Sequence, residues 1–213
     1  MSERQTAASI GGRLRQLRTG SGRSLRSVAE AVGISSSALS QIETGIMQPS
    51  VNRLVELVSV LGVPVSAIFE DSDVLRPVSV DGGEVSEPIP GVVVQGGQAE
   101  MTLGQGVIYR RLTPTRIDGV DFFETVYPPL TTSSVDGAML VHEGYEVGRV
   151  LSGTLLFEFS EGSVQLGPGE ALSFWATRPH RVVNESPDVS ACAIWLTLRN
   201  WREGADREDT EVG

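Results

Sequence analysis

The chain has 213 residues and a formal net charge of −10, from 17 basic and 27 acidic side chains. A single cysteine excludes a disulfide framework and a zinc site made of several cysteines. There is no secretory leader and no apolar run near about eighteen residues, so we expect a cytoplasmic protein with no membrane partner. The length suits one or two domains, each with a core of its own.

The charges are divided unevenly along the chain. Residues 1–70 carry seven Arg and five acidic residues, whereas residues 71–213 carry ten Arg and twenty-two acidic residues. Residues 13–53 alone hold six Arg and two Glu, a net charge of +4. A basic patch in one region is what phosphate binding needs, and an acidic remainder would be repelled by nucleic acid. The pattern favours nucleic-acid binding by the N-terminal part, although many soluble helical domains reach the same charge.

Apolar residues recur at helical spacing through the first 70 residues. They predict a helix over residues 9–18, two short helices within 25–44, and a helix that begins near Ser50 and ends at Gly62. A last short helix over 64–69 would complete a domain of five helices. Residues 71–90 turn to Asp, Ser, Gly, Pro and Glu, which is typical of a linker.

The stretch 25–44 places two of these helices on either side of a sharp turn. Gly33 can end the first helix in a left-handed conformation, and the Ser35 hydroxyl can cap the first free N–H groups of the second. The small side chain of Ala29 lets the helices approach closely. This spacing predicts a helix-turn-helix whose second helix lies in the major groove of DNA. The alternative is an ordinary helical hairpin that binds no DNA.

The same stretch resembles the XRE or Cro/phage-repressor family of helix-turn-helix regulators. The small residue, the turn glycine and the apolar positions of that family fall at Ala29, Gly33, Val28, Val32, Ile34, Leu39 and Ile42. The resemblance implies a DNA-binding domain over residues 1–70 that reads a double-stranded operator. One such module buries little surface on DNA, so we expect a homodimer that binds two half-sites.

The first turns of the second helix carry polar side chains that can reach base edges. We expect the base-reading residues to be Ser36, Ser37, Ser40 and Gln41. Arginines nearby are expected to position the protein on phosphates. These residues are Arg13, Arg23 and Arg26.

From about residue 91 the pattern changes to short apolar or alternating runs separated by Gly and Pro, which predicts an all-β sandwich or small barrel. The expected strands lie in residues 107–113, 122–128, 138–144, 148–159, 163–167, 171–176, 180–184 and 191–198. Cys192 falls in the last run and is expected to be buried. Residues 201–213 are charged and nearly free of apolar groups, so we expect an acidic disordered tail.

Two blocks of this region, residues 142–153 and 166–184, resemble the cupin superfamily of jelly-roll barrels. The matching positions are His142, Glu146, Gly153, Gly169, His180 and Asn184. The chain departs from the family pattern where Leu140 stands in place of the first histidine. Trp175 and Thr177 replace the usual proline and glycine of the second block.

The two histidines of the chain both fall on ligand positions of the cupin pattern, together with one glutamate. His142 and Glu146 are an even number of residues apart, so both can point into the same interior. Two histidines and one carboxylate suit Fe(II), Zn or Mn, so one interpretation is a divalent metal held by His142, Glu146 and His180. The alternative is a metal-free pocket in which these groups bind each other. We expect Tyr145, Arg149 and Trp175 to line a pocket for a small-molecule effector.

In this order the two resemblances match a class of bacterial regulators. We therefore predict an α + β protein with a DNA-binding domain over 1–70, a linker over 71–90, a cupin jelly-roll barrel over 91–200 and a tail over 201–213. Its predicted function is sequence-specific transcription regulation with small-molecule sensing by the cupin, and not catalysis. The alternative is a mononuclear non-haem iron oxygenase or epoxidase, because the phosphonate epoxidase family also resembles a helical domain followed by a cupin with a His-Glu-His site.

Overall fold

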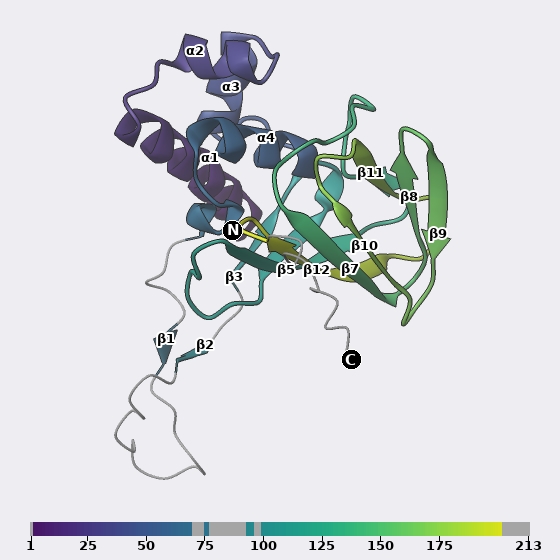
Figure 1. The fold of residues 1–213 in the computed structure, drawn as a ribbon. Coiled ribbons are helices and arrows are strands. Elements are labelled where there is room, and N and C mark those ends of the chain that lie inside the picture. The colour runs from purple at the N-terminus through teal and green to yellow at the C-terminus, as the bar shows by residue number, and fades with distance from the viewer. Residues whose placement is uncertain (1, 70–74, 77–92, 96–98, 202–213) are drawn as a thin grey trace, which may run out of the picture.

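The computed structural model describes residues 2–69, 75–76, 93–95 and 99–201 (Figure 1). The predicted linker over 71–90 and the predicted tail over 201–213 lie almost entirely outside these residues. Within the described part of the chain, no helix is long and apolar enough to cross a membrane.

The helical domain is built from α1 (Ser2–Gly20), α2 (Leu25–Ala31), α3 (Ser36–Glu43) and α4 (Val51–Leu61), followed by the 3-10 turn η1 (Val65–Ile68). Three serines cap these helices: the side chains of Ser24, Ser35 and Ser50 accept from backbone N–H groups of α2, α3 and α4. Gly33 adopts the left-handed conformation predicted for the turn, with φ of 69°.

The prediction of five α-helices is wrong, because residues 64–69 form a single 3-10 turn and the described residues contain four α-helices. Only four residues separate Pro64 from Phe69, and both of these flanking residues have extended backbone angles. That span is too short for a ladder of i to i−4 hydrogen bonds.

The sequence from β3 onward forms two antiparallel sheets that face each other. The six-stranded sheet has the order β10-β7-β12-β5-β4-β3, and the four-stranded sheet has the order β6-β11-β8-β9. A separate two-stranded ribbon pairs β1 (Leu75–Arg76) with β2 (Val94–Gln95). The strands of the two sheets are β3 (Ala99–Thr102), β4 (Ile108–Arg111), β5 (Val120–Tyr127), β6 (Thr131–Thr132), β7 (Tyr145–Ser152), β8 (Leu155–Phe159), β9 (Gly162–Leu166), β10 (Ala171–Trp175), β11 (His180–Asn184) and β12 (Ala191–Leu198).

Three predictions for the β-region need correction. The barrel is not closed, because no hydrogen-bonded ladder joins the two sheets of the described residues. The predicted strand over 138–144 is a loop that makes one isolated bridge, between Leu140 and His180. Cys192 lies on β12 but is only partly buried, since it belongs to the outward-facing positions of that strand.

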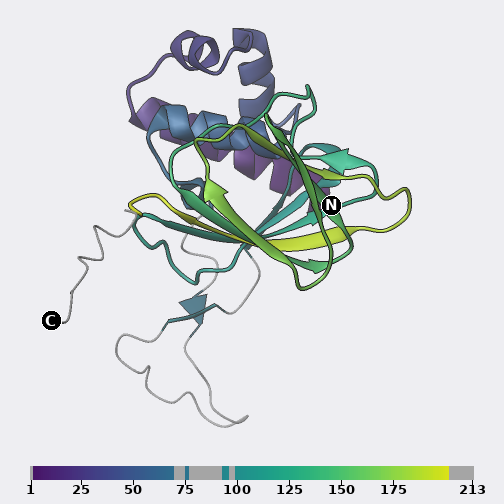
Figure 2. The same ribbon diagram turned by 45° about the vertical axis from the view of Figure 1, so that its right-hand side comes forward.

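The helical domain packs directly on the β-sandwich, with α4 nearer to the sheets than α2 and α3 (Figures 1 and 2). The rings of Phe69 and Phe123 stack with centroids 5.9 Å apart, one from each domain. The backbone N–H of Asn52 donates to the carbonyl of Ser133 over 2.9 Å. Buried apolar residues form one continuous cluster across both domains. The fold therefore holds the two domains in a defined relative position.

Candidate functional site

Three side chains from separate parts of the cupin domain meet at one point. His142 lies in the loop before β7, Glu146 lies on β7, and His180 begins β11. Nε2 of His142 is 3.2 Å from Oε1 of Glu146, and Nε2 of His180 is 3.7 Å from Oε2 of the same carboxylate. One donor atom from each residue lies within 4.8 Å of the other two. The structure thus brings together the three predicted metal ligands.

The remaining polar atoms of this cluster are held so that both Nε2 atoms face the carboxylate. Nδ1 of His142 lies 3.0 Å from the carbonyl of Glu143, and Nδ1 of His180 lies 2.8 Å from the carbonyl of Arg178. The Thr197 hydroxyl donates to Oε1 of Glu146 over 3.1 Å. Metal-binding histidines are commonly oriented by such a bond from the other ring nitrogen. The donor set therefore fits a divalent metal ion.

The cluster shifts the pKa of each of its members. Burial alone would lower the pKa of His142, but the hydrogen bond and charge of Glu146 outweigh it, so this pKa is raised. Burial would raise the pKa of Glu146, but the two histidines and Thr197 lower it. Burial dominates at His180 and lowers its pKa. The carboxylate therefore stays ionised, and His180 favours the neutral form that binds metal.

The cluster borders a cavity of about 510 Å³, a size typical of small-molecule sites. The cupin side of the wall includes Asp121, whose carboxylate accepts from Arg199 over 2.5 Å and from the backbone N–H of Ser66 over 3.2 Å. The helical domain supplies the other side. The full lining is Val51, Asn52, Val55, Ser59, Gly62, Val63, Tyr109, Asp121, Thr125, Tyr127, Ser133, Leu140, His142, Glu143, Glu146, His180, Val182, Trp195, Thr197 and Arg199.

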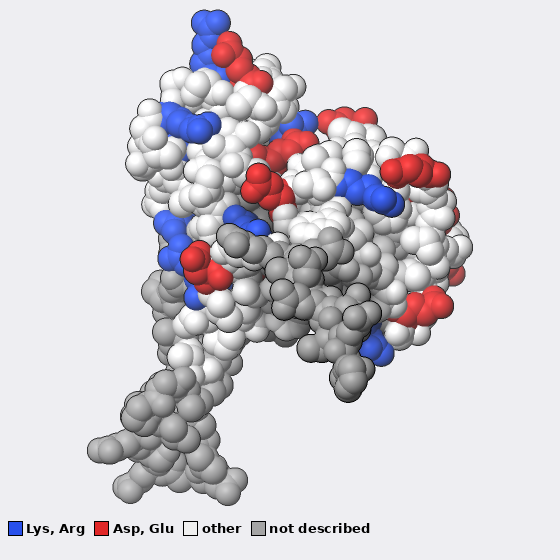
Figure 3. Space-filling view, viewed as in Figure 1, with Lys and Arg blue, Asp and Glu red and all other residues white. Residues whose placement is uncertain are grey.

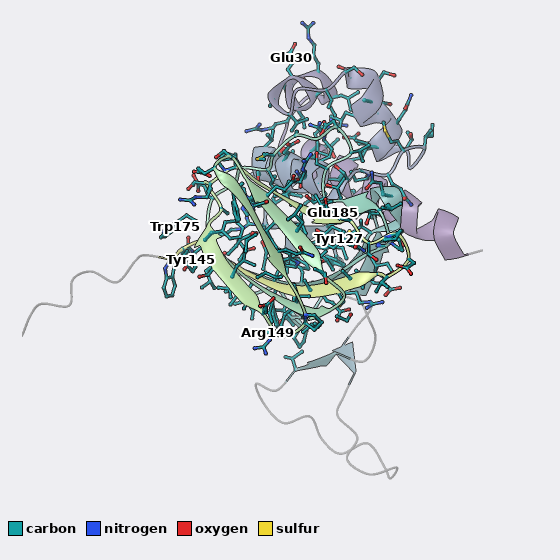
Figure 4. The ribbon with its side chains drawn as sticks, turned by 90° about the vertical axis from the view of Figure 1, so that its right-hand side faces the viewer. Glu30, Tyr127, Tyr145, Arg149, Trp175 and Glu185 are labelled. Carbon is teal, nitrogen blue, oxygen red and sulfur yellow. The ribbon has the colours of Figure 1, made fainter. Side chains whose placement is uncertain are left out.

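The predicted pocket residues Tyr145, Arg149 and Trp175 do not border this cavity. They lie on the outer side of the six-stranded sheet, where Tyr145 packs edge-on against Trp175 with ring centroids 5.2 Å apart (Figure 4). Successive residues of a strand point to opposite faces. Because Glu146 points inward, Tyr145 and Arg149 on β7 point outward. Trp175 on β10 is paired with Tyr145 and is exposed on the same side of the sheet.

Sequence reasoning missed several lining residues. Thr197 and Trp195 share the inward face of β12 with Ala193, so the period of two in the run 191–198 could have found them. Asp121 could have been found in the same way on β5. No signal in the sequence indicates that residues of α4 line the cavity, because the spacing of their valines is that of an ordinary apolar helix face.

The predicted base-reading residues lie on one short helix. Ser37 and Gln41 are exposed on α3, and Ser36 and Ser40 are partly exposed. Among the predicted phosphate contacts, Arg23 and Arg26 are exposed. Figure 3 shows basic and acidic side chains on both domains in this view.

Arg13 is placed differently from the other predicted phosphate contacts. Its Nε donates to the carbonyl of Ala67 over 2.9 Å, and its Nη1 donates to Gln16 over 3.2 Å. The Ala67 bond ties α1 to η1, where the backbone N–H of Ser66 donates to Asp121 of the cupin domain. Arg13 therefore stabilises the packing of the helical domain, and its predicted phosphate contact stays a prediction.

Comparisons with known proteins agree with both domains. The helix-turn-helix domain family matches residues 9–68, and the cupin domain family matches residues 127–197. The HTH-type transcriptional regulator PuuR of Escherichia coli (strain K12) is 30% identical over 182 residues, which cover 84% of this chain and 89% of PuuR. The chain belongs to the PuuR-like helix-turn-helix transcriptional regulators. PuuR of Shigella flexneri is similar to the same extent.

The fold of this regulator is shared with a solved structure. An HTH_3 family transcriptional regulator from Vibrio cholerae superposes with a TM-score of 0.65 over 95% of this chain and 100% of that one, at 21% identity. Hydroxypropylphosphonic acid epoxidase from S. wedmorenis gives a TM-score of 0.38 at 16% identity, over 91% and 99% of the two chains. That likeness is too small to support the oxygenase alternative. The predicted XRE-type DNA-binding transcriptional regulator with a cupin domain is confirmed.

Proposed function

We propose that this regulator binds a double-stranded operator as a homodimer and responds to a small-molecule effector held in the cavity beside His142, Glu146 and His180. The observation that carries the proposal is the position of this cluster. It faces a cavity of about 510 Å³ that lies directly against the DNA-binding domain. We place the DNA-binding domain at residues 1–70 and the cupin domain at residues 91–200, with residues 71–90 as the linker between them.

For DNA recognition, we propose that α3 lies in the major groove. The exposed side chains of Ser37 and Gln41, with Ser36 and Ser40 beside them, would contact base edges. The exposed Arg23 and Arg26 would contact phosphates. A homodimer is proposed because two such modules on two half-sites bury enough surface for specific binding.

For the cupin domain, we propose a divalent metal, Fe, Zn or Mn, held by His142, Glu146 and His180. Such a metal would offer open coordination positions to donor atoms of an effector. The buried carboxylate and the orientation of the two rings support this proposal. We propose a sensing role and no catalytic residues. The mononuclear iron oxygenase remains the second candidate, because two histidines and one carboxylate are also the ligand set of those enzymes.

The test combines DNA binding with metal analysis. Fluorescence anisotropy of the full-length protein would compare DNA from upstream of its own gene with a scrambled duplex, at several salt concentrations. Each measurement would be made on protein stripped by a chelator and on protein reloaded with Fe(II), Zn(II) or Mn(II). We expect a preference for the upstream duplex and an affinity that falls steeply with salt. Absence of DNA binding at low salt, together with iron-dependent oxygen consumption, would favour the oxygenase.

A further inference from the structure

The wall of the cavity is divided between the two domains by chemistry as well as by position. All of its titratable side chains come from the cupin. They include Asp121, Arg199 and the three residues of the metal-type cluster, which are His142, Glu146 and His180. The helical domain contributes no charged side chain. Its lining residues come from α4 and the turn that follows it, namely Val51, Asn52, Val55, Ser59, Gly62 and Val63.

Two buried valines of α4 form the apolar part of the helical side of the cavity wall. Val51 and Val55 are each 8% exposed, and they lie one helical turn apart on α4. The spacing i, i+4 puts them on the same face of the helix. A molecule in the cavity therefore meets Val51 and Val55 on the α4 side, with the uncharged polar side chains of Asn52 and Ser59 beside them. On the cupin side it meets all the charged groups of the wall.

The start of α4 is fastened to the chain segment that leads into the metal-type cluster. The backbone N–H of Asn52 donates to Ser133, and its side-chain Nδ2 donates to the carbonyl of Ala138 over 3.0 Å. From there the chain runs to Leu140, which exchanges two backbone hydrogen bonds with His180, and then to His142. A change at the cluster thus has a short covalent and hydrogen-bonded route to α4.

Arg53, the residue after Asn52, joins α4 to the helix-turn-helix itself. Nη1 of Arg53 donates to the carbonyl of Val32 over 2.5 Å, at the end of α2. Nη2 of the same guanidinium lies 3.1 Å from Asp136 of the cupin. The position of α4 on the cupin is therefore linked to the position of α2 and α3.

We propose that the effector lies between the two domains, with its polar head at the His142, Glu146 and His180 cluster and its apolar body against Val51 and Val55 of α4. The ligand class is an amphipathic small molecule. This inference rests on the proposed function and adds that the DNA-binding domain contacts the effector directly. Occupancy then changes how α4 sits on the cupin, and the helix-turn-helix moves with α4.

The test uses the full-length protein and the uncharged dye N-phenyl-1-naphthylamine, whose emission rises in apolar surroundings. Val55→Trp fills the α4 side of the cavity and leaves the metal-type cluster in place. We expect it to weaken dye binding at least about tenfold. Val164→Trp, at an exposed position of β9, is the matched control and should bind the dye like the wild type. Ser59→Trp, at an exposed lining position, gives a second obstruction that does not disturb the core.

A second arm measures the Kd for the upstream duplex with and without saturating dye. We expect the dye to change this Kd at least about fivefold in the wild type and in Val164→Trp, a typical size for coupling between sites. In Val55→Trp and Ser59→Trp the change should be lost. If both obstructed variants bind the dye like the wild type, the inference is overturned. If the dye still changes the Kd for the upstream duplex in Val55→Trp and Ser59→Trp, the proposed effector response stands, and only the contact between effector and α4 is wrong.

Discussion

Nε2 of His142 lies 3.2 Å from Oε1 of Glu146, and this single contact couples the protonation of the two side chains. The carboxylate raises the pKa of the imidazole above its ordinary value near 6.5. The imidazole in turn helps to lower the pKa of Glu146 below its ordinary value near 4.5. Because the two histidines are the only ones in the chain, both titrations can be resolved directly.

We predict that NMR titration of the metal-free protein gives a pKa above 6.5 for His142 and below 6.5 for His180. Glu146→Gln should lower the pKa of His142, because the opposing charge is removed while burial remains. The raised histidine pKa stabilises the fold below pH 6.5, and this contribution is lost as pH rises through the folded value. The lowered carboxylate pKa stabilises it above pH 4.5, and this is lost as pH falls.

Glu146→Gln should therefore reduce the thermal stability most between pH 4.5 and 6.5, where the carboxylate is ionised and His142 is protonated. At pH 8 the reduction should be smaller. Thermal unfolding across this range is the measurement. An unchanged His142 pKa in Glu146→Gln would contradict the contact.

Metal binding should depend on the residue that orients the carboxylate as well as on the ligands. We predict that Thr197→Val lowers the affinity for Zn(II) or Mn(II) about 10- to 100-fold, because the hydroxyl no longer donates to Glu146. Glu146→Ala should lower it further. Isothermal titration calorimetry on chelator-treated protein measures both. Thr177→Val, at an exposed position, is the control and should bind metal like the wild type. Equal metal affinities in the wild type and the three variants would mean that the metal binds elsewhere.

Gln41 is exposed on α3, where it is proposed to read a base pair. Gln41→Ala should cost about 1 to 3 kcal/mol in binding to the preferred duplex and relax specificity at one base pair. Anisotropy against a set of duplexes with single base changes is the measurement. Gln165→Ala, at an exposed position of β9, should leave all affinities unchanged. Full discrimination retained by Gln41→Ala would remove this residue from the set of base contacts.

Two adjacent glycines of α1 differ in their surroundings. A Cβ atom on Gly11 would lie 2.2 Å from the carbonyl oxygen of Ile42, whereas a Cβ on Gly12 would meet nothing within 4 Å. Gly11→Ala should therefore destabilise the helical domain by about 1 to 3 kcal/mol or more, because α1 and α3 must separate. Gly12→Ala should be stabilising by about 0.5 to 1 kcal/mol. Urea unfolding of the two variants checks this, and equal stabilities would show that the helices are not in close contact.

The sequence by itself determined the features that depend on local spacing. A glycine in the turn, a capping serine and apolar residues at helical intervals identify the helix-turn-helix, because these interactions span only a few residues. His142, Glu146 and His180 were found through the cupin pattern. The even separation of His142 and Glu146 does not explain their contact, because His142 lies in the loop before β7. Most strands between residues 107 and 198 follow from alternation and turn residues.

Only the tertiary structure decided which faces meet. Tyr145 and Arg149 lie on the outer side of the six-stranded sheet because they alternate with the inward-pointing Glu146 on β7. Trp175 lies on the same side because β10 pairs with β7 and places Trp175 opposite Tyr145, a pairing that no local pattern records. Arg13 is held by Ala67, which lies 54 residues further along the chain. The closure of the cavity by Val51 and Val55 depends on how two domains pack, and that packing joins residues too distant in sequence for any local pattern to record.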